Sequence, residues 1–527
     1  ECVMSNLSEL IPAGGGQNNT DFVADGAITS GKPVILNSAG TVTQVGISTV
    51  AADIPYGSSS IWSTSAHSSY YQASTFHDPT NTGKFIVGYL NGSNYTTVLV
   101  GTTSGSTISY GTPIVLISAT TYESPIIAWN PNKANQIAVF YYDNSLSFMA
   151  VGGTVASGSG TTITWATAVN VSGGSGSFWD RQIAFDPTQT STPYRFLMNW
   201  YQQGTVKLRS CEITDADALT MGTVYSFTAA EYQDASMGIS FDASGTFLFS
   251  AKEQGLNSIA GRTGSISGSG GSAAISISGE TVITSTAASM ALHDQSYAAQ
   301  IDPNNDDKFL FVYNDTSNEQ YCVIGSLSGS GSSATITMGT PVKYSTVTTG
   351  VEFLNWAFDP AGDKSFVITA RNGTYAASRP LDNFAMLGTY SGTVPTIDST
   401  MYFLNTLGSA KLMNEAVNFD TTSSVFYLSG VRNDNDDGTI YLGKMSVDAT
   451  NMTATNLLGI ASAAILDTAT GTINTWGSRN EVQTSLTIGS DYYVQSDGTI
   501  TTASASPAQL IGEAITATQI NIKDYTG

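Results

Sequence analysis

The chain has 527 residues, and its 41 acidic residues against 19 basic ones give it a formal net charge of −22. Such a surface repels phosphate backbones, so we expect no nucleic-acid partner. Hydrophobic residues make up 41% of the chain, which is enough for packed cores and argues against disorder. No apolar run approaches the roughly 18 residues of a spanning helix and no secretory signal is recognisable, so we expect no membrane insertion.

The composition predicts an all-β fold. Short apolar runs alternate with turns rich in Ser, Thr, Asn and the 52 glycines, and long amphipathic helical patterns are absent. The three cysteines, Cys2, Cys211 and Cys322, give neither a disulfide framework nor metal-ligand spacing, and the last two are expected on strands.

The two ends of the chain carry matching segments. After an arm rich in Gly and Asn (1–20), the stretch 31–43 aligns without gaps with 489–501, and both are predicted to be hairpins around a tight turn, Ser-Ala-Gly-Thr and Ser-Asp-Gly-Thr. We therefore expect the N-terminal segment 21–50 and the C-terminal segment 456–527 to meet in one small β module.

A repeated motif dominates the region between these ends. An apolar run ending in an aromatic residue or Ile, then Asp or Asn and often Pro, occurs seven times. The acidic or amide residues of the motif are Asp78, Asn130, Asp186, Asp242, Asp302, Asp359 and Asp420. From first to last there are 342 residues over six intervals, a mean period of 57.

Each motif is followed by three further apolar runs, as in Lys84–Tyr89, Thr96–Gly101 and Thr107–Leu116. Four short strands with their turns are the content of a propeller blade. The sequence thus predicts a seven-bladed β-propeller over residues 70–455. We interpret the repeated Asp as a turn residue whose carboxylate accepts backbone N–H groups, because Asn130 serves in its place without a charge.

The two ends also carry a resemblance to known proteins. Met4-Ser-Asn-Leu-Ser-Glu-Leu-Ile-Pro-Ala-Gly-Gly-Gly-Gln-Asn, Asp21-Phe-Val-Ala-Asp-Gly and Thr484-Ser-Leu-Thr-Ile-Gly-Ser-Asp-Tyr-Tyr-Val-Gln-Ser-Asp-Gly-Thr-Ile resemble segments of virion structural or tail-fibre-like proteins of tailed bacteriophages, particularly marine ones. The resemblance covers roughly the first 45 and last 70 residues. It implies a homo-oligomeric virion protein that contacts other virion proteins and is assembled in the host cytoplasm, and it carries over no catalytic residues.

The candidate ligand-binding residues lie just before each repeated Asp, where the connecting loops of a propeller often form a binding face. Six of the seven positions have an acid, the first has two tyrosines, and one acid is preceded by a tryptophan. The candidates are Tyr70, Tyr71, Glu123, Trp179, Asp180, Asp234, Asp294, Glu352 and Glu415. Carboxylates beside aromatic rings suit a hydroxyl-rich ligand such as a host-surface glycan. Connecting loops are also polar in proteins that bind nothing, so the pattern leaves both interpretations open.

One segment resembles part of a calcium loop. In Asn433-Asp-Asn-Asp-Asp-Gly-Thr, Asp434 and Asp436 alternate as calcium ligands do, but the distal acid of an EF-hand is missing because residue 445 is Met. The same residues also suit a hairpin turn. No other cofactor is expected.

Signals for catalysis are few. His293-Asp294 has no accompanying nucleophile motif, and paired carboxylates for glycoside cleavage are not identifiable among so many acids. The sequence therefore predicts a non-enzymatic virion protein acting in assembly or host-surface attachment. The alternatives are a carbohydrate-active propeller enzyme, such as a depolymerase on the same particle, and a cellular adhesin or lectin.

Overall fold

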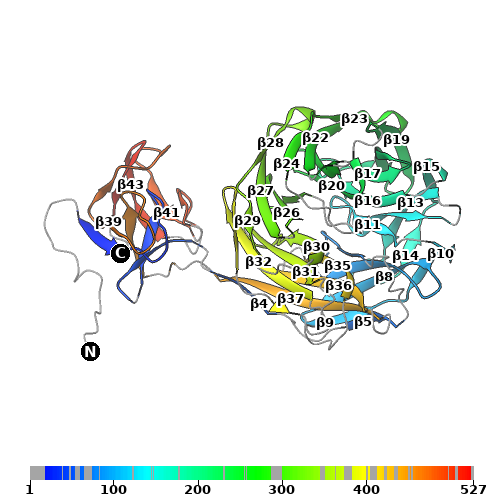
Figure 1. The fold of residues 1–527 in the computed structure, drawn as a ribbon, viewed down its shortest axis with the longest axis horizontal. Helices are drawn as coiled ribbons and strands as arrows, with labels where there is room; N and C mark the ends of the chain where they lie inside the picture. Colours follow the sequence, from blue (N-terminus) through cyan, green and yellow to red (C-terminus); the bar gives the residue numbers. More distant parts are fainter. Residues whose placement is uncertain are drawn as a thin grey trace. The chain divides into compact units, whose positions relative to one another are not determined.

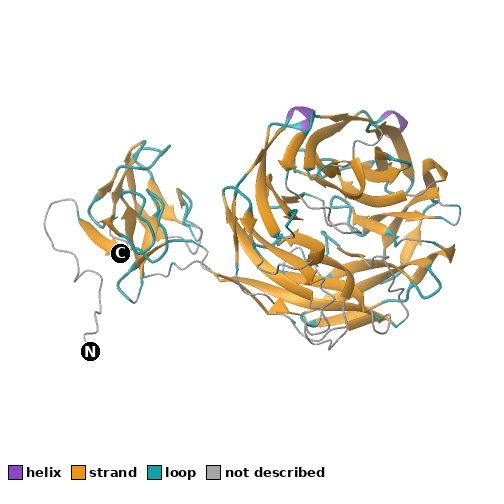
Figure 2. Cartoon of the chain, in the orientation of Figure 1, coloured by secondary structure: helices purple, strands orange, loops and turns teal. Residues whose placement is uncertain are grey.

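The computed structural model describes residues 18–523 except 38, 47–48, 54–59, 65–73, 82, 122–123, 144, 146, 176–177, 229–231, 254–255, 257, 286–298, 318, 345–350, 363, 373–382, 399–401, 404–411, 421–423, 433–436, 449–451, 453–454, 496–497 and 505–508. The fold is all-β, as predicted, and the helices of the described residues are two single 3-10 turns, η2 (Gly270–Ser272) and η3 (Gly331–Ser333) (Figure 2). Neither is long and apolar enough to cross a membrane. The chain divides into two compact units, one of residues 1–50 and 447–527 and one of residues 51–446.

The larger unit consists of antiparallel sheets of four or five strands. The first sheet has β6 (Ser74–His77), β7 (Lys84–Leu90), β8 (Tyr95–Ser104), β9 (Thr107–Tyr110) and β10 (Ile114–Thr120). The second has β11 (Ile126–Trp129), β12 (Gln136–Tyr142), β13 (Ser147–Val155), β14 (Ile163–Trp165) and β15 (Val169–Ser175), and the third has β16 (Phe178–Phe185), β17 (Tyr194–Gln202), β18 (Thr205–Ile213) and β19 (Leu219–Ser226). The fourth has β20 (Tyr232–Phe241), β21 (Phe247–Glu253), β22 (Ile259–Ser267), β23 (Ala274–Ile277) and β24 (Thr281–Thr284), and the fifth has β25 (Gln300–Asp302), β26 (Asn305–Asn314), β27 (Gln320–Ser328), β28 (Thr335–Met338) and β29 (Val342–Lys343). The sixth has β30 (Val351–Phe358), β31 (Ser365–Asn372), β32 (Asn383–Ser391), β33 (Val394–Ile397) and β34 (Tyr402–Phe403). The last has β35 (Leu412–Phe419), β36 (Val425–Arg432), β37 (Gly438–Asp448), β4 (Thr49–Asp53) and β5 (Ser60–Ser63).

These sheets form a closed ring, which is the architecture of a β-propeller (Figure 1). The first strand of each sheet contacts the first strand of the next, from β6 through β11, β16, β20, β25 and β30 to β35, and β35 contacts β6 again. The last sheet is completed by β4 and β5 from the N-terminal side of the repeats, because both pair with β37. The repeat motif predicts that the ring begins at residue 70. The ring in fact begins earlier in the chain, with β4 and β5. The motif could not show this, since β4 and β5 carry no repeat.

A Phe–Gly pair recurs across the second and third strands of five sheets. The pairs in register are Phe85–Gly101, Phe247–Gly264, Phe309–Gly325, Phe366–Gly388 and Phe426–Gly443. A Cβ atom built on any of these glycines would lie 2.1–2.4 Å from the facing ring. The Phe ring thus lies over the glycine, which is a known way to stabilise a strand glycine. In the third sheet Cys211, buried and on β18 as predicted, faces Phe196 at this place.

The repeated Asp is a buried turn residue, as predicted. Asp78 Oδ1 accepts the Thr80 N–H at 2.8 Å, and Asp302 Oδ1 accepts the Asn304 N–H at 2.8 Å. Asn130, Asp186, Asp242 and Asp359 accept the N–H two residues on in the same way. In these six sheets the side chain holds the turn between the first and second strands, so its role there is structural.

Three neighbouring pairs of sheets are joined by a side chain at the start of a second strand. Lys84 Nζ donates to Ala156 O at 2.5 Å, Gln136 Nε2 to Thr214 O at 2.8 Å and Arg195 Nη2 to Gly268 O at 2.6 Å. In each case the acceptor lies in the turn that ends the third strand of the next sheet. A long polar side chain at this place therefore links one sheet to the following one.

The smaller unit contains two sheets of five strands. One has the order β1 (Asn19–Val23), β39 (Thr470–Thr475), β38 (Leu457–Ala461), β2 (Pro33–Leu36), β3 (Val42–Gln44), and the other β40 (Arg479–Asn480), β44 (Gln519–Ile522), β43 (Gln509–Thr516), β41 (Asp491–Val494), β42 (Ile500–Thr501). The two matching segments of the sequence form the hairpins β2–β3 and β41–β42, as predicted. Ile35, Leu457 and Ile460 of the first sheet share a core with Tyr492, Ile511 and Ile520 of the second.

Candidate binding pocket

Four of the nine residues predicted to bind a ligand lie outside the residues that the structure describes. Tyr70, Tyr71, Glu123 and Asp294 fall in gaps of the described residues, as do Asp434 and Asp436, the candidates for calcium. Among the described residues, no group of three or more His, Cys, Asp or Glu side chains could hold a metal ion.

The other candidates correct the expectation that these residues lie in loops. Trp179 and Asp180 belong to strand β16, Asp234 to β20, Glu352 to β30 and Glu415 to β35. The pairing register of these four strands shifts at this point, between Trp179 and Arg181, Tyr232 and Met237, Glu352 and Asn355, and Met413 and Ala416. A strand can extend this far beyond the motif because a local irregularity absorbs the extra residues.

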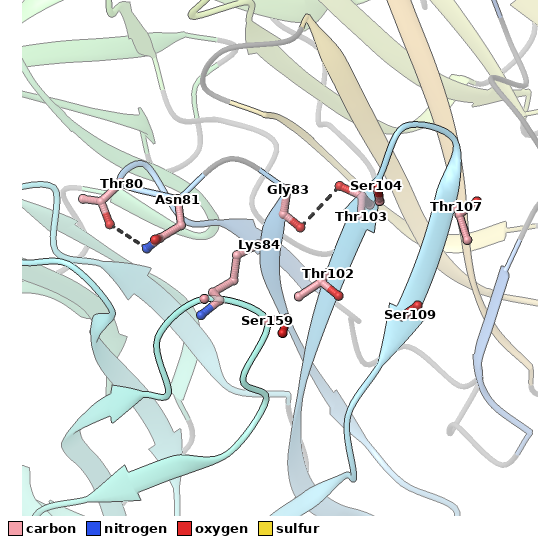
Figure 3. Close-up of a pocket in the computed structure, with 11 residues that line it drawn as sticks. Thr80, Asn81, Gly83, Lys84, Thr102, Thr103, Ser104, Thr107, Ser109 and Ser159 are labelled. Carbon is pink, nitrogen blue, oxygen red and sulfur yellow. Dashed lines mark hydrogen bonds between the residues drawn. The ribbon is translucent and has the colours of Figure 1, made fainter.

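The structure instead shows a pocket at the opposite end of the first strands, beside the Asp78 turn (Figure 3). Its cavity volume is about 470 Å³. The lining comes from the Asp78 turn and β7, the end of β8, β9, and the turn between β13 and β14: Thr80, Asn81, Gly83, Lys84, Thr102, Thr103, Ser104, Thr107, Ser109, Gly158 and Ser159. Seven of these eleven residues carry hydroxyl groups, so the wall can both donate and accept hydrogen bonds.

The Asp78 turn fixes one wall. Asp78 Oδ1 also accepts the Thr80 hydroxyl at 2.7 Å, and Asp78 Oδ2 accepts Asn81 Nδ2 at 2.6 Å. On the other side Thr103 donates its N–H to Gly83 O at 2.6 Å and its hydroxyl lies 2.8 Å from that of Tyr427. These bonds position the lining without using the hydroxyl groups of Thr102, Ser104, Thr107, Ser109 and Ser159.

Lys84 is the charged residue of the described lining. It is buried, and its ammonium group donates to Asn135 Oδ1 at 3.2 Å as well as to Ala156 O. Burial lowers the pKa of Lys84 from its ordinary value, and the charge of Asp78 partly opposes that change. Both of these acceptors are neutral, so neither offsets the charge of the ammonium group.

The equivalent place in the second sheet is filled. Gln136 takes the position of Lys84, since Asn130 N donates to Gln136 O as Asp78 N donates to Lys84 O, both at 2.9 Å. There the Asp217 carboxylate accepts Gln136 Nε2 at 2.8 Å and the Thr154 hydroxyl at 2.7 Å. The turn beside Lys84 has Gly158 and Ser159, whose small side chains leave the space open.

A second cavity, of about 310 Å³, lies on the ring axis and is lined by residues of all seven first strands. Its polar side chains are used between sheets: Gln182 Oε1 accepts Ile239 N at 3.0 Å, and Ser240 Oγ accepts Ile301 N at 3.1 Å. Asn418 Nδ2 donates to Thr75 O. Because these bonds join neighbouring first strands, the polar side chains that make them hold the ring together.

Sequence reasoning missed the open pocket because it concentrated on the loops before each motif. A signal was present in Thr107-Ile-Ser-Tyr of β9, where alternation places Thr107 and Ser109 on one face of the strand. The other contributors, Lys84 and Ser159, are 75 positions apart and meet only when the first two sheets pack.

Comparison with known proteins finds structures of similar fold but no family to which the chain can be assigned. No protein-family model matches the chain, and no curated protein matches it. Among solved structures, the BP39L lectin from Burkholderia pseudomallei is 11% identical, with a TM-score of 0.46 over 73% of this chain and 98% of that one. The six-bladed Aleuria aurantia lectin is 11% identical, with a TM-score of 0.38 over 64% and 97%. The Dos1 propeller is 10% identical, with a TM-score of 0.41 over 80% and 94%. These values decide neither ligand nor activity.

Proposed function

We propose that the ring is a seven-bladed propeller that binds a glycan without cleaving it, through the pocket between its first and second sheets. The observation that carries this proposal is the set of pocket hydroxyl groups left over by the surrounding turns, on Thr102, Ser104, Thr107, Ser109 and Ser159. Sugars offer hydroxyl groups as both donors and acceptors, and a wall of Ser and Thr matches them. A cavity of about 470 Å³ is within the range of small-ligand sites.

A pair of variants on one turn tests the site. Ser159→Trp fills the pocket, whereas Ser157→Trp changes an exposed residue of the same turn that does not line it. On an array of host-surface oligosaccharides, the wild type and Ser157→Trp are expected to bind the same glycans and Ser159→Trp to lose them. Equal binding by both variants would move the site elsewhere. Release of reducing ends during incubation with the bound polysaccharide would replace binding by depolymerase activity.

We further propose that the protein is displayed on a phage particle and serves host-surface attachment. The support is the resemblance of the two ends to tailed-phage virion proteins. A virion protein of this kind is expected to be homo-oligomeric. Labelling purified particles with an antibody against the ring tests both points, since electron microscopy gives location and copy number together. Absence from particles would favour a cellular adhesin or lectin.

A further inference from the structure

The pocket contains a buried cation, Lys84, whose cross-strand neighbour is not a carboxylate. In the third sheet Arg195 is paired across the strands with Glu212, and their Nη2 and Oε1 atoms lie 3.6 Å apart. In the first sheet Lys84 occupies the corresponding place and its cross-strand partner is Thr102. The described lining of the pocket includes no Asp or Glu. The charge of Asp78 acts on Lys84, but among the described residues both hydrogen-bond acceptors of the ammonium group are neutral. The contact that Glu212 makes with Arg195 is therefore left for a ligand anion.

We propose that the pocket takes an anionic saccharide, whose carboxylate or sulfate group is held by Lys84 and by the hydroxyl groups of Thr102 and Ser159. Thr102 is the cross-strand neighbour of Lys84, and Ser159 lies in the turn whose Ala156 carbonyl already accepts from the ammonium group (Figure 3). This inference rests on the proposed function and adds the charge of the sugar to it.

The electrostatics of the site favour an anion despite the net charge of −22. Asp78 is the acid that acts on Lys84, and its two oxygens are already engaged by the Thr80 N–H and hydroxyl and by the Asn81 amide. A ligand anion at Lys84 would form a charge-assisted hydrogen bond with a buried ammonium group. Elsewhere the acidic surface repels such a ligand, so binding is expected to concentrate at this point.

The test places the missing carboxylate opposite Lys84. Thr102→Glu reproduces the Arg195–Glu212 arrangement, and Thr102→Gln has nearly the same size without the charge. Calorimetry on the full chain would compare galacturonate oligomers with galactose oligomers, and dextran sulfate with dextran. We expect the wild type to bind the anionic member of a pair at least about tenfold more tightly, the scale of one charged hydrogen bond. Thr102→Gln loses the Thr102 hydroxyl and should keep a smaller preference, because Lys84 and Ser159 remain. Thr102→Glu should abolish that difference.

The two pairs of sugars distinguish the possible anionic groups. A preference for the galacturonate oligomers indicates a carboxylate, and a preference for dextran sulfate indicates a sulfate. Equal affinity for anionic and neutral sugars, unchanged in Thr102→Glu, would overturn this inference while leaving glycan binding intact. Failure to bind any sugar would overturn the proposed function itself. Lys84→Gln is a second variant. Its amide can still donate to Ala156 O, just as Gln136 donates to Thr214 O in the second sheet, but it has no charge. We expect it to lose the anionic preference as well.

A separate observation concerns the smaller unit, whose two sheets have the same strand order. Equivalent backbone hydrogen bonds recur between them: Gly31 N to Ala461 O at 3.0 Å and Gly489 N to Ala514 O at 2.8 Å. The hairpin turns also match, with Gly40 N to Asn37 O at 2.9 Å and Gly498 N to Gln495 O at 3.0 Å. The φ angles of Gly40 and Gly498 are 81° and 76°. Agreement of order, register and turn indicates one unit present twice.

We infer that the smaller unit is an internally duplicated module and that the ring is inserted into a loop of its first copy. In the second copy the chain passes from β42 to β43 through residues 502–508, whereas in the first copy the same passage, from β3 to β38, contains the whole ring. Such a module would fold independently of the ring and could carry different inserted domains in the same loop.

Specific protease sites placed at 47–48 and at 449–451 of the full chain test this inference. After both cuts, the fragments 1–47 and 452–527 are expected to stay together through the β1–β39 and β2–β38 pairings, and the thermal transitions of module and ring should both persist. The uncut variant is the control. Separation of the two terminal fragments, or loss of either transition on cleavage, would show that module and insert depend on one another.

Discussion

The hydroxyl groups of Thr103 and Tyr427 lie 2.8 Å apart and join the first sheet of the ring to the last. Tyr427 is fully buried, and its ring packs 5.1 Å from that of Phe85. Tyr427→Phe keeps this packing and removes the hydrogen bond, so we expect the ring to lose about 1 kcal/mol of unfolding free energy.

Urea unfolding followed by fluorescence measures that change. Tyr321→Phe is the control, because its hydroxyl donates to Glu319 within one hairpin of the fifth sheet. If both variants lost the same stability, the seam between the first and last sheets would be no more sensitive than a surface hairpin.

Alkaline pH should also destabilise the contact between the first and last sheets of the ring. Tyr89 packs against Trp62 of β5, and the Tyr110 hydroxyl donates to Ser60 O at 3.3 Å; burial raises the pKa of each tyrosine to about 12. Because the folded pKa is above the unfolded value of 10, the stability that these groups contribute is complete below pH 10 and is lost as the pH rises through 12.

We therefore expect the free energy of unfolding to fall between pH 10 and pH 11.5, and to fall less steeply in a Tyr89→Phe/Tyr110→Phe variant. Urea titrations at half-unit steps of pH measure both slopes. Identical slopes would assign the alkaline loss to other groups.

The sequence revealed the parts of the fold that repeat locally. The Asp turns, the strands that follow them and the matching terminal hairpins depend on residues close together in the chain, such as Asp78 with Thr80 or Asn37 with Thr41. Closure of the ring could not be seen, because β5 pairs with β37, nearly 380 positions later, and has no motif of its own. The pocket was missed for the same reason, since Lys84 and Ser159 belong to different sheets.

The Phe–Gly pairs show what a repeat pattern can hide. Phe309 and Gly325 each look like an ordinary strand residue in the sequence, and only the pairing register places the ring over the glycine. Gly325→Ala would bring a methyl group to 2.1 Å from the Phe309 ring, so we expect a loss of about 1–3 kcal/mol. Phe309→Leu in the same chain removes the clash, and the double variant should lose less than the sum of the two single variants. Additive losses in a urea double-mutant cycle would mean that the two residues do not act as a pair.

Trp62 lies on β5, the N-terminal strand that completes the last sheet of the ring. It is 5% exposed on β5, packs 4.5 Å from the Tyr89 ring, and lies where a Cβ on Gly438 would be 2.3 Å from its own ring. Trp62→Ala should therefore cost about 3–5 kcal/mol, the range for a large buried aromatic residue, and should expose the edge of β37. The matched control is Trp476→Ala in the smaller unit, since Trp476 is 37% exposed. We expect this control to leave the unfolding of the ring unchanged, and hydrogen exchange at β36 and β37 to rise only in Trp62→Ala. Unchanged exchange in both variants would mean that the last sheet is stable without its N-terminal strands.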